Sequence, residues 1–211
     1  MRETRRAAHP TAETTATEYL RALSQLMLST EVTGRDGTAL SLDEGSSRAV
    51  QMILSVGAAS RKVMLVGNGG SAAIVSHMQN DLCKAVGVRA MVFTEQPLLT
   101  ALANDHGYGC VYERTVELWA EPGDLMLAVS SSGSSENILR AVAASEERDC
   151  GVITLSGFNP DNPLRRKGDL NFYVGSDFYG YVENAHRALT HLMTDRAMLI
   201  AKPHSGAHDG T

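Results

Sequence analysis

A run of serines at residues 130–135 has the composition of a phosphate-binding loop. The sequence there is SSSGSS, and it lies between a buried apolar stretch and a predicted helix. The first N–H groups of a helix have no partner within the helix and lie at the positive end of its dipole, so they bind anions. Serine hydroxyls can donate further hydrogen bonds to phosphate oxygens, and Gly133 lets the backbone approach closely. A serine-rich turn that only caps a helix is the alternative; the position directly after a strand favours a phosphate site.

A second loop, GNGGSA at residues 67–72, fits the G-x-G-x-x-A pattern of dinucleotide-binding proteins. Glu95, which would then bind the ribose, comes later in the chain than that pattern requires. A chain of 211 residues is also short for a cofactor domain plus a substrate domain. A dinucleotide-dependent oxidoreductase is therefore a weak alternative. Neither loop has the Gly-Lys-Ser/Thr ending of a nucleoside-triphosphate loop.

Acidic and histidine side chains recur at helical spacing in two places. His77 and Asp81 are four residues apart, so they share one face of the helix predicted after the glycine loop. Glu183 and His191, with His186 between them, lie on the last predicted helix, about 80° apart around its axis. Two histidines and two carboxylates would suit zinc or another divalent first-row metal. A histidine that serves only packing is the alternative for each position.

Five short apolar segments predict the strands that position these side chains. They alternate with helical patterns and cover residues 62–66, 88–93, 124–129, 151–155 and 170–174. This alternation predicts an α/β fold, a three-layer αβα sandwich around a five-stranded parallel sheet. Ligands of such sheets bind beyond the carboxyl ends of the strands, where both loops are expected.

Two helices are expected ahead of the sheet and one long helix after it. The leading helices cover residues 15–31 and 46–57, with a turn-rich break at 34–42 between them, and the final helix covers 180–201. Residues 1–14 and 202–211 are expected to form a disordered and a flexible tail, respectively.

The composition limits the classes of partner. The net charge of −5 argues against nucleic acid and against an anionic membrane surface, since both favour a basic face. No apolar run approaches a membrane span of about 18 residues, and no signal peptide is apparent. The three cysteines, Cys83, Cys110 and Cys150, form no CxxC pair, which favours reduced thiols in a reducing compartment. We therefore expect a cytoplasmic protein.

Five segments in this order resemble the sugar isomerase (SIS) domain family, and within it the phosphoheptose isomerases. They are GNGGSA (67–72), His77, NDHGYG (104–109), SSSGSS (130–135) and ENAHRALTH (183–191). The resemblance covers roughly residues 15 to 200 and implies a single SIS domain at 15–201. It also implies a homotetramer with active sites between subunits, and interconversion of sedoheptulose 7-phosphate with D-glycero-D-manno-heptose 7-phosphate.

The resemblance also implies roles for individual residues. Those implied for the sugar and its phosphate are Asn68, Gly69, Gly70, Ser71, Asn104, Asp105, Ser130, Ser131, Ser132 and Ser135. Those implied for zinc are His77, Asp81, Glu183 and His191.

The sequence departs from the family at two of the zinc positions. The family has Glu where this chain has Asp81 and Gln where it has Glu183, and a family arginine falls on Ala85, beside Lys84. A shorter carboxylate matters, because misplacing a catalytic group by about 1 Å can cost about a hundredfold in rate. We expect Asp81 or Glu183 to act as the carbon base and His191 as its acid/base partner. A non-catalytic sugar-phosphate sensor or interaction protein, and an isomerase for another sugar phosphate, are the alternatives.

Overall fold

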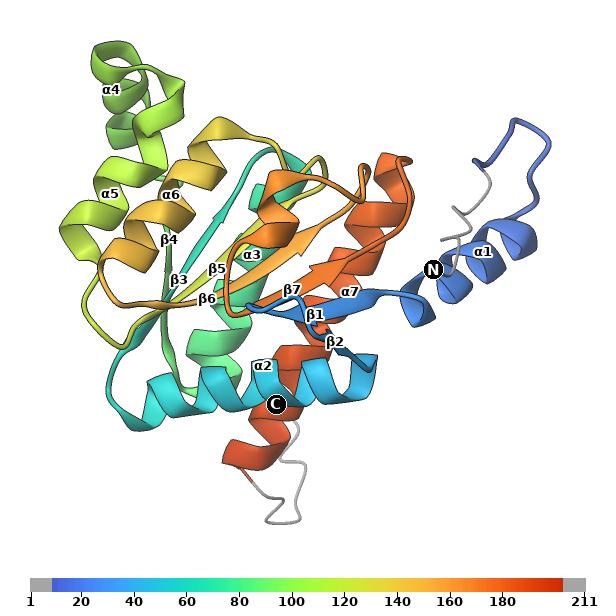
Figure 1. Cartoon of the computed structure of the whole chain (residues 1–211), viewed down its shortest axis with the longest axis horizontal. Coiled ribbons are helices and arrows are strands. Elements are labelled where there is room, and N and C mark those ends of the chain that lie inside the picture. The colour runs from blue at the N-terminus through green and yellow to red at the C-terminus, as the bar shows by residue number, and fades with distance from the viewer. Residues whose placement is uncertain (1–8, 203–211) are drawn as a thin grey trace, which may run out of the picture.

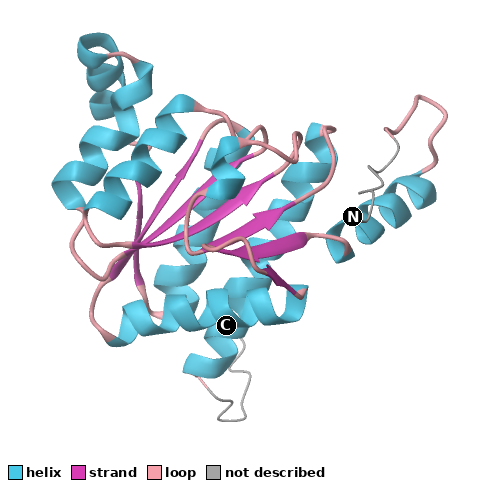
Figure 2. Ribbon diagram, viewed as in Figure 1, coloured by secondary structure: helices cyan, strands magenta, loops and turns pink. Residues whose placement is uncertain are grey.

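A seven-stranded sheet runs through the middle of the computed structural model, which describes residues 9–202 (Figures 1 and 2). The strand order is β2-β1-β7-β6-β5-β3-β4. The strands are β1 (Glu31–Gly34), β2 (Ala39–Leu40), β3 (Lys62–Gly67), β4 (Arg89–Val92), β5 (Leu125–Ser130), β6 (Gly151–Ser156) and β7 (Leu170–Tyr173). The five strands from β7 to β4 are parallel and correspond to the five predicted segments, so the predicted parallel sheet is confirmed.

The predicted strand count is wrong by two, because a hairpin extends the sheet at one edge. β1 pairs antiparallel with β7, and β2 pairs antiparallel with β1. β1 begins at Glu31, where the first helix was expected to end, and β2 lies within the expected turn-rich break at 34–42. In β1 only Val32 is fully buried, so the segment shows little of the apolar pattern that predicts a strand. β1 forms a strand because it pairs with the edge of β7, a segment far away in the sequence, and local sequence patterns do not reveal such a pairing.

Helices cover both faces of the sheet. They are α1 (Ala16–Leu28), α2 (Leu42–Ala58), α3 (Gly70–Asp81), α4 (Gln96–His106), α5 (Val111–Trp119), α6 (Glu136–Glu147) and α7 (Tyr179–Ala201). Short helical turns occupy Leu82–Val86, Tyr108–Cys110 and Pro163–Arg166. Figure 1 shows α2, α3 and α7 on one side of the sheet and α5 and α6 on the other.

Two apolar clusters fill the spaces between these layers. Side chains alternate along β3, so Val63 and Leu65 join the cluster under α2, α3 and α7, whereas Met64 and Val66 join the one under α5 and α6. Such double burial explains why β3, β5 and β6 are almost continuously apolar in the sequence.

Helix boundaries follow from local capping. Thr15 caps α1 in a reciprocal arrangement with Glu18, which fixes the start of that helix. Ser41 accepts a hydrogen bond from the backbone of Glu44, so α2 begins at Leu42 and not at Ser46 as expected.

The predicted tails at 1–14 and 202–211 lie largely outside the described residues. Within the described part, His9 Nε2 lies 2.5 Å from a carboxylate oxygen of Asp177, in the loop ahead of α7. None of the helices in residues 9–202 is long and apolar enough to cross a membrane.

Candidate functional site

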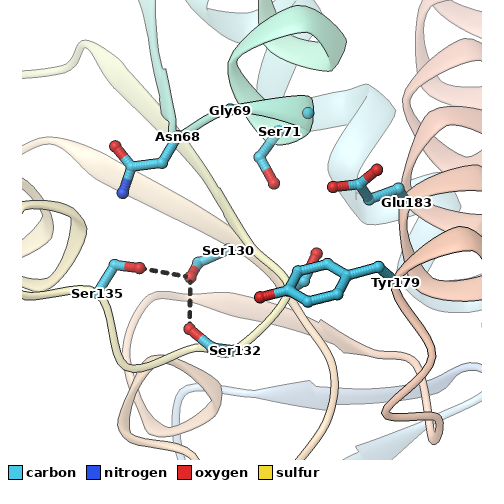
Figure 3. Close-up of a pocket in the computed structure, with 10 residues that line it drawn as sticks. Asn68, Gly69, Ser71, Ser130, Ser132, Ser135, Tyr179 and Glu183 are labelled. Carbon is cyan, nitrogen blue, oxygen red and sulfur yellow. Dashed lines mark hydrogen bonds between the residues drawn. The ribbon is translucent and has the colours of Figure 1, made fainter.

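The serine and glycine loops lie side by side at the carboxyl ends of β5 and β3. These strands are neighbours in the sheet, with Gly67 paired to Val129, so the loops that follow them diverge from adjacent points. A cavity of about 230 Å³ lies between the loops (Figure 3). Eight of the predicted substrate-binding residues line it: Asn68, Gly69, Gly70, Ser71, Ser130, Ser131, Ser132 and Ser135.

The serine loop forms a neutral cradle of hydroxyl groups. The Ser130 hydroxyl lies 3.5 Å from that of Ser132 and 3.4 Å from that of Ser135. The Ser131 hydroxyl is buried and has no hydrogen-bond partner among the described residues. Helix α6 begins directly after the loop, and no lysine or arginine within residues 9–202 lines this cavity. Hydroxyls and the first N–H groups of α6 can therefore bind an anion without a charged side chain.

Glycine is required at the turn of this loop. Gly133 has a φ of +63°, and a Cβ there would collide with the side chain of Asn162. The Asn162 amide donates to the carbonyls of Gly157 and Asn159 at 3.1 and 2.8 Å, which fixes the shape of the loop after β6. The Leu164 N–H donates to the carbonyl of Gly133 at 3.0 Å and joins this segment to the serine loop.

Asn68 is fixed by a network of polar side chains. Its amide and that of the buried Asn137 exchange hydrogen bonds of 3.0 and 2.9 Å. The Tyr108 hydroxyl donates to the Asn68 side-chain oxygen at 3.0 Å. The Tyr112 hydroxyl donates to the carbonyl of Gly67 at 2.8 Å, and burial raises the pKa of Tyr112 to about 12. The glycine loop is thus anchored to α6 and α5.

Glu183 lines two adjoining cavities. A second cavity of about 310 Å³ shares Gly70 and Glu183 with the first and extends to His77 and Arg187. A Cβ at Gly70 would overlap the Glu183 carboxylate, so the glycine lets that carboxylate lie directly over the start of α3. We call the two cavities the two lobes of one cleft, the serine lobe and the arginine lobe.

His77, Asp81 and His191 form a compact cluster between α3 and α7. Asp81 Oδ2 lies 3.4 Å from His77 Nε2 and 3.6 Å from His191 Nδ1, and the two imidazole rings are 4.8 Å apart. One ligand atom from each residue lies within 4.8 Å of the others. Two imidazoles and a carboxylate are a donor set that fits zinc. Glu183, predicted as a fourth ligand, is not part of this cluster.

His186 has a structural environment. Its Nε2 lies 3.1 Å from the carbonyl oxygen of Ser156, at the end of β6, and its ring is fully buried. Burial lowers the pKa of His186 to about 4, so the ring is neutral near pH 7 and donates from Nε2 to the carbonyl. This contact docks α7 against the sheet.

Asn104 and Asp105 are the two predicted substrate-binding residues that line neither lobe. Both are exposed on α4, a helix that projects from the fold in Figure 1. Three residues at the site were not predicted from the sequence. Tyr179 lines the serine lobe, Asn137 pairs with Asn68, and Arg187 lines the arginine lobe. Arg187 had a readable signal, since it stands one turn after Glu183 on the same helix face.

Comparison with known proteins identifies relatives of this fold and sequence. Residues 18–157 match the model of the SIS domain. A phosphoheptose isomerase of Bordetella avium is 31% identical over 177 residues, which are 76% of this chain and 89% of that protein. One from Thiobacillus denitrificans is 31% identical over 168 residues, covering 76% of this chain and 83% of its own.

Two solved structures have the same arrangement. The phosphoheptose isomerase of Neisseria gonorrhoeae superposes with a TM-score of 0.69 at 29% identity, covering 74% of this chain and 87% of the other. The one from Francisella tularensis gives a TM-score of 0.74 at 24% identity, covering 86% and 95%, and supports the fold alone.

Proposed function

This chain belongs to the sugar isomerase (SIS) domain family, and from that premise we propose that it is an aldose–ketose isomerase acting on sedoheptulose 7-phosphate. The product is D-glycero-D-manno-heptose 7-phosphate. One observation carries the proposal: the neutral anion cradle and the carboxylate of Glu183 open on the same cleft. The phosphate at one end of the sugar can then be held while the other end reacts.

The isomerisation transfers protons without any redox partner. A base takes a proton from C1, and the electrons of that C–H bond form the C1–C2 double bond of the enediol. The carbonyl electrons move to O2, which receives a proton as O1 loses one. The base then returns its proton to C2, and C1 becomes the aldehyde carbon.

Glu183 is the carboxylate best placed to be this base, since it lines both lobes of the cleft. Asp81 lines neither lobe and lies between the two histidines. We assign Asp81 to orienting them. The proton exchange between O1 and O2 falls to His191, through the ring nitrogen that would not bind a metal. His77, which lines the arginine lobe, has the role of a ligand.

His77, Asp81 and His191 are the residues that would hold zinc. When bound, zinc supplies Lewis-acid polarisation of a sugar oxygen. Glu183 stays outside this ligand set in our proposal and is free to act as a base. A carboxylate bound to a metal is a weaker base, so the separation of the two roles is chemically favourable.

The proposal includes a homotetramer in the cytoplasm. The exposed positions of Asn104 and Asp105 on α4 are consistent with sites completed by a second copy of the chain. The free thiols of the three cysteines are consistent with a reducing compartment.

Proton NMR in deuterated water tests the function. Purified protein of known zinc content is incubated with sedoheptulose 7-phosphate. We expect the heptose to appear with deuterium at C2, and His191→Ala to lose product and deuterium while its circular dichroism stays unchanged. Folded, zinc-loaded wild-type protein that gives neither product nor exchange would contradict the proposal; unchanged turnover in His191→Ala would overturn that residue's role.

A further inference from the structure

The arginine lobe contains a cation that takes no part in the proton transfers of the isomerisation. Arg187 is exposed on α7, and its guanidinium has no ion pair or hydrogen bond to another described residue. Glu183 precedes it by one helical turn, so the two side chains project from the same face of α7. Gly70 and His77 border the same lobe from α3.

Arg187 is the only lysine or arginine among the described residues that line either lobe. The serine lobe offers neutral donors for the phosphate, so Arg187 is not needed there. The cleft therefore has a neutral anion site at one end and a permanent positive charge at the other. An arginine also presents several N–H donors in a fixed planar fork, which suits two neighbouring oxygens.

The phosphate and the reacting carbons of the substrate lie at opposite ends of the sugar. In a heptulose 7-phosphate, C1 and C2 are at the opposite end of the chain from the phosphate. When the phosphate lies in the serine lobe, the sugar extends past Gly70 and Glu183, which the lobes share, toward His77 and Arg187. Removal of the C1 proton there leaves a negative charge on the oxygen of C2.

We propose that Arg187 is a catalytic residue that binds this enediolate oxyanion, an inference that rests on the proposed function. Glu183 takes the proton from C1, the carbonyl electrons move to O2, and the guanidinium of Arg187 donates hydrogen bonds to O2 as its charge develops. A donor already oriented toward a developing oxyanion stabilises the transition state more than the ground state.

Arg187→Gln and Arg187→Lys test the assignment, with Arg148→Gln as the matched control. Arg148 is exposed at the end of α6 and lines neither lobe. In the zinc-loaded protein we expect Arg187→Gln to lower kcat by about 10² to 10³ with little change in KM. Arg187→Lys should recover part of that loss, because it keeps the charge without the fork. Arg148→Gln should match the wild type.

A binding measurement separates this inference from the proposed function. Calorimetry on chelator-treated, metal-free protein compares a sugar-phosphate hydroxamate, which mimics the enediolate, with inorganic phosphate. We expect Arg187→Gln to lose about a hundredfold in affinity for the hydroxamate and to keep its affinity for phosphate. Equal affinities in wild type and variant, or equal losses for both ligands, would overturn the assignment.

Failure of the proposed function and failure of the Arg187 assignment give different experimental results. A wild-type protein without isomerase activity would contradict the proposed function, and the hydroxamate comparison would still decide on Arg187. An active wild type whose kcat is unchanged by Arg187→Gln would refute the role of Arg187 and leave the proposed function standing.

Discussion

The two carboxylates near the cleft have different surroundings, and this divides their roles. Asp81 lies within 3.6 Å of nitrogen atoms on two imidazoles, whereas Glu183 borders open space in both lobes. A general base must reach the proton that it abstracts, so position decides before basicity does. The sequence alone could not decide which of the two carboxylates is the base.

Glu183→Gln should therefore separate chemistry from binding. We expect kcat to fall by about 10² to 10⁴, since the amide cannot accept the C1 proton, while the affinity for inorganic phosphate stays unchanged. Glu147→Gln, an exposed change on α6 outside both lobes, is the control. Steady-state kinetics and phosphate titration provide the readouts.

Asp81→Asn tests the role of the other carboxylate, which we assign to the metal site and not to proton transfer. It should weaken zinc binding by about tenfold or more, as measured by competition with a chelator, because a ligand is lost from the cluster. If Asp81→Asn abolishes deuterium exchange at full zinc occupancy and Glu183→Gln does not, Asp81 is the base.

Helix α7 carries Glu183 and Arg187, which line the cleft, and a buried polar contact helps to fix its position. Glu183, Arg187 and His191 project from it at intervals of one turn. On its buried side, His186 is bonded to the carbonyl of Ser156 at the end of β6. The strand next to β6 is β5, which leads directly into the serine loop. The His186 contact therefore helps to fix the position of α7 relative to the serine loop.

The buried His186 predicts a dependence of stability on pH. Its pKa in the folded protein is lowered from 6.5 to about 4, so below pH 6.5 the unfolded chain binds a proton that the folded protein does not. The free energy of unfolding should fall as the pH drops from 6.5 towards 4, by up to about 3 kcal/mol from this residue.

Urea unfolding across that pH window measures the effect, with His186→Asn as the comparison. The difference in unfolding free energy between wild type and variant should be largest above pH 6.5 and shrink as the pH falls. A difference that is constant with pH would mean that His186 does not stay neutral in the folded protein.

At the scale of the whole molecule, the residues implied for one site are spread over separate surfaces. Asn104 and Asp105 are exposed on α4 and line neither lobe, whereas the other predicted residues border the cleft or its histidine cluster. Several large apolar side chains are also exposed, among them Leu20, Leu28, Leu118 and Trp119. Contiguous apolar patches mark contacts between proteins, so these side chains are candidates for contacts between copies of the chain.

Complementation between two inactive variants tests whether sites lie between copies. We expect Asn104→Ala/Asp105→Ala and Glu183→Gln each to be nearly inactive alone. When the two are co-expressed and assemble at random, about a quarter of the sites combine an intact Glu183 with an intact α4 from another copy. Activity should return to about that fraction of wild type.

Light scattering provides the control, with four chains of 22.6 kDa expected per particle. A site built within one chain would give no recovery, since every chain in the mixture carries one of the changes. That result would contradict a site shared between copies.

The sequence by itself determined the parallel sheet, the family and most of the residues around the cleft. The strands β3, β5 and β6 are buried on both faces, so their sequences are almost continuously apolar. Such runs can be recognised in the sequence without knowledge of the tertiary structure. Loops that follow adjacent parallel strands meet at one edge of the sheet, so the serine and glycine loops could be paired in advance.

Only the tertiary structure decided which side chains face the cleft and which face one another. Nothing in the sequence separates Glu183, which borders both lobes, from Asp81, which lies between His77 and His191. The hairpin of β1 and β2 depends on the edge of β7. These features arise from contacts between segments far apart in the chain, and local sequence patterns report only on the segment that contains them.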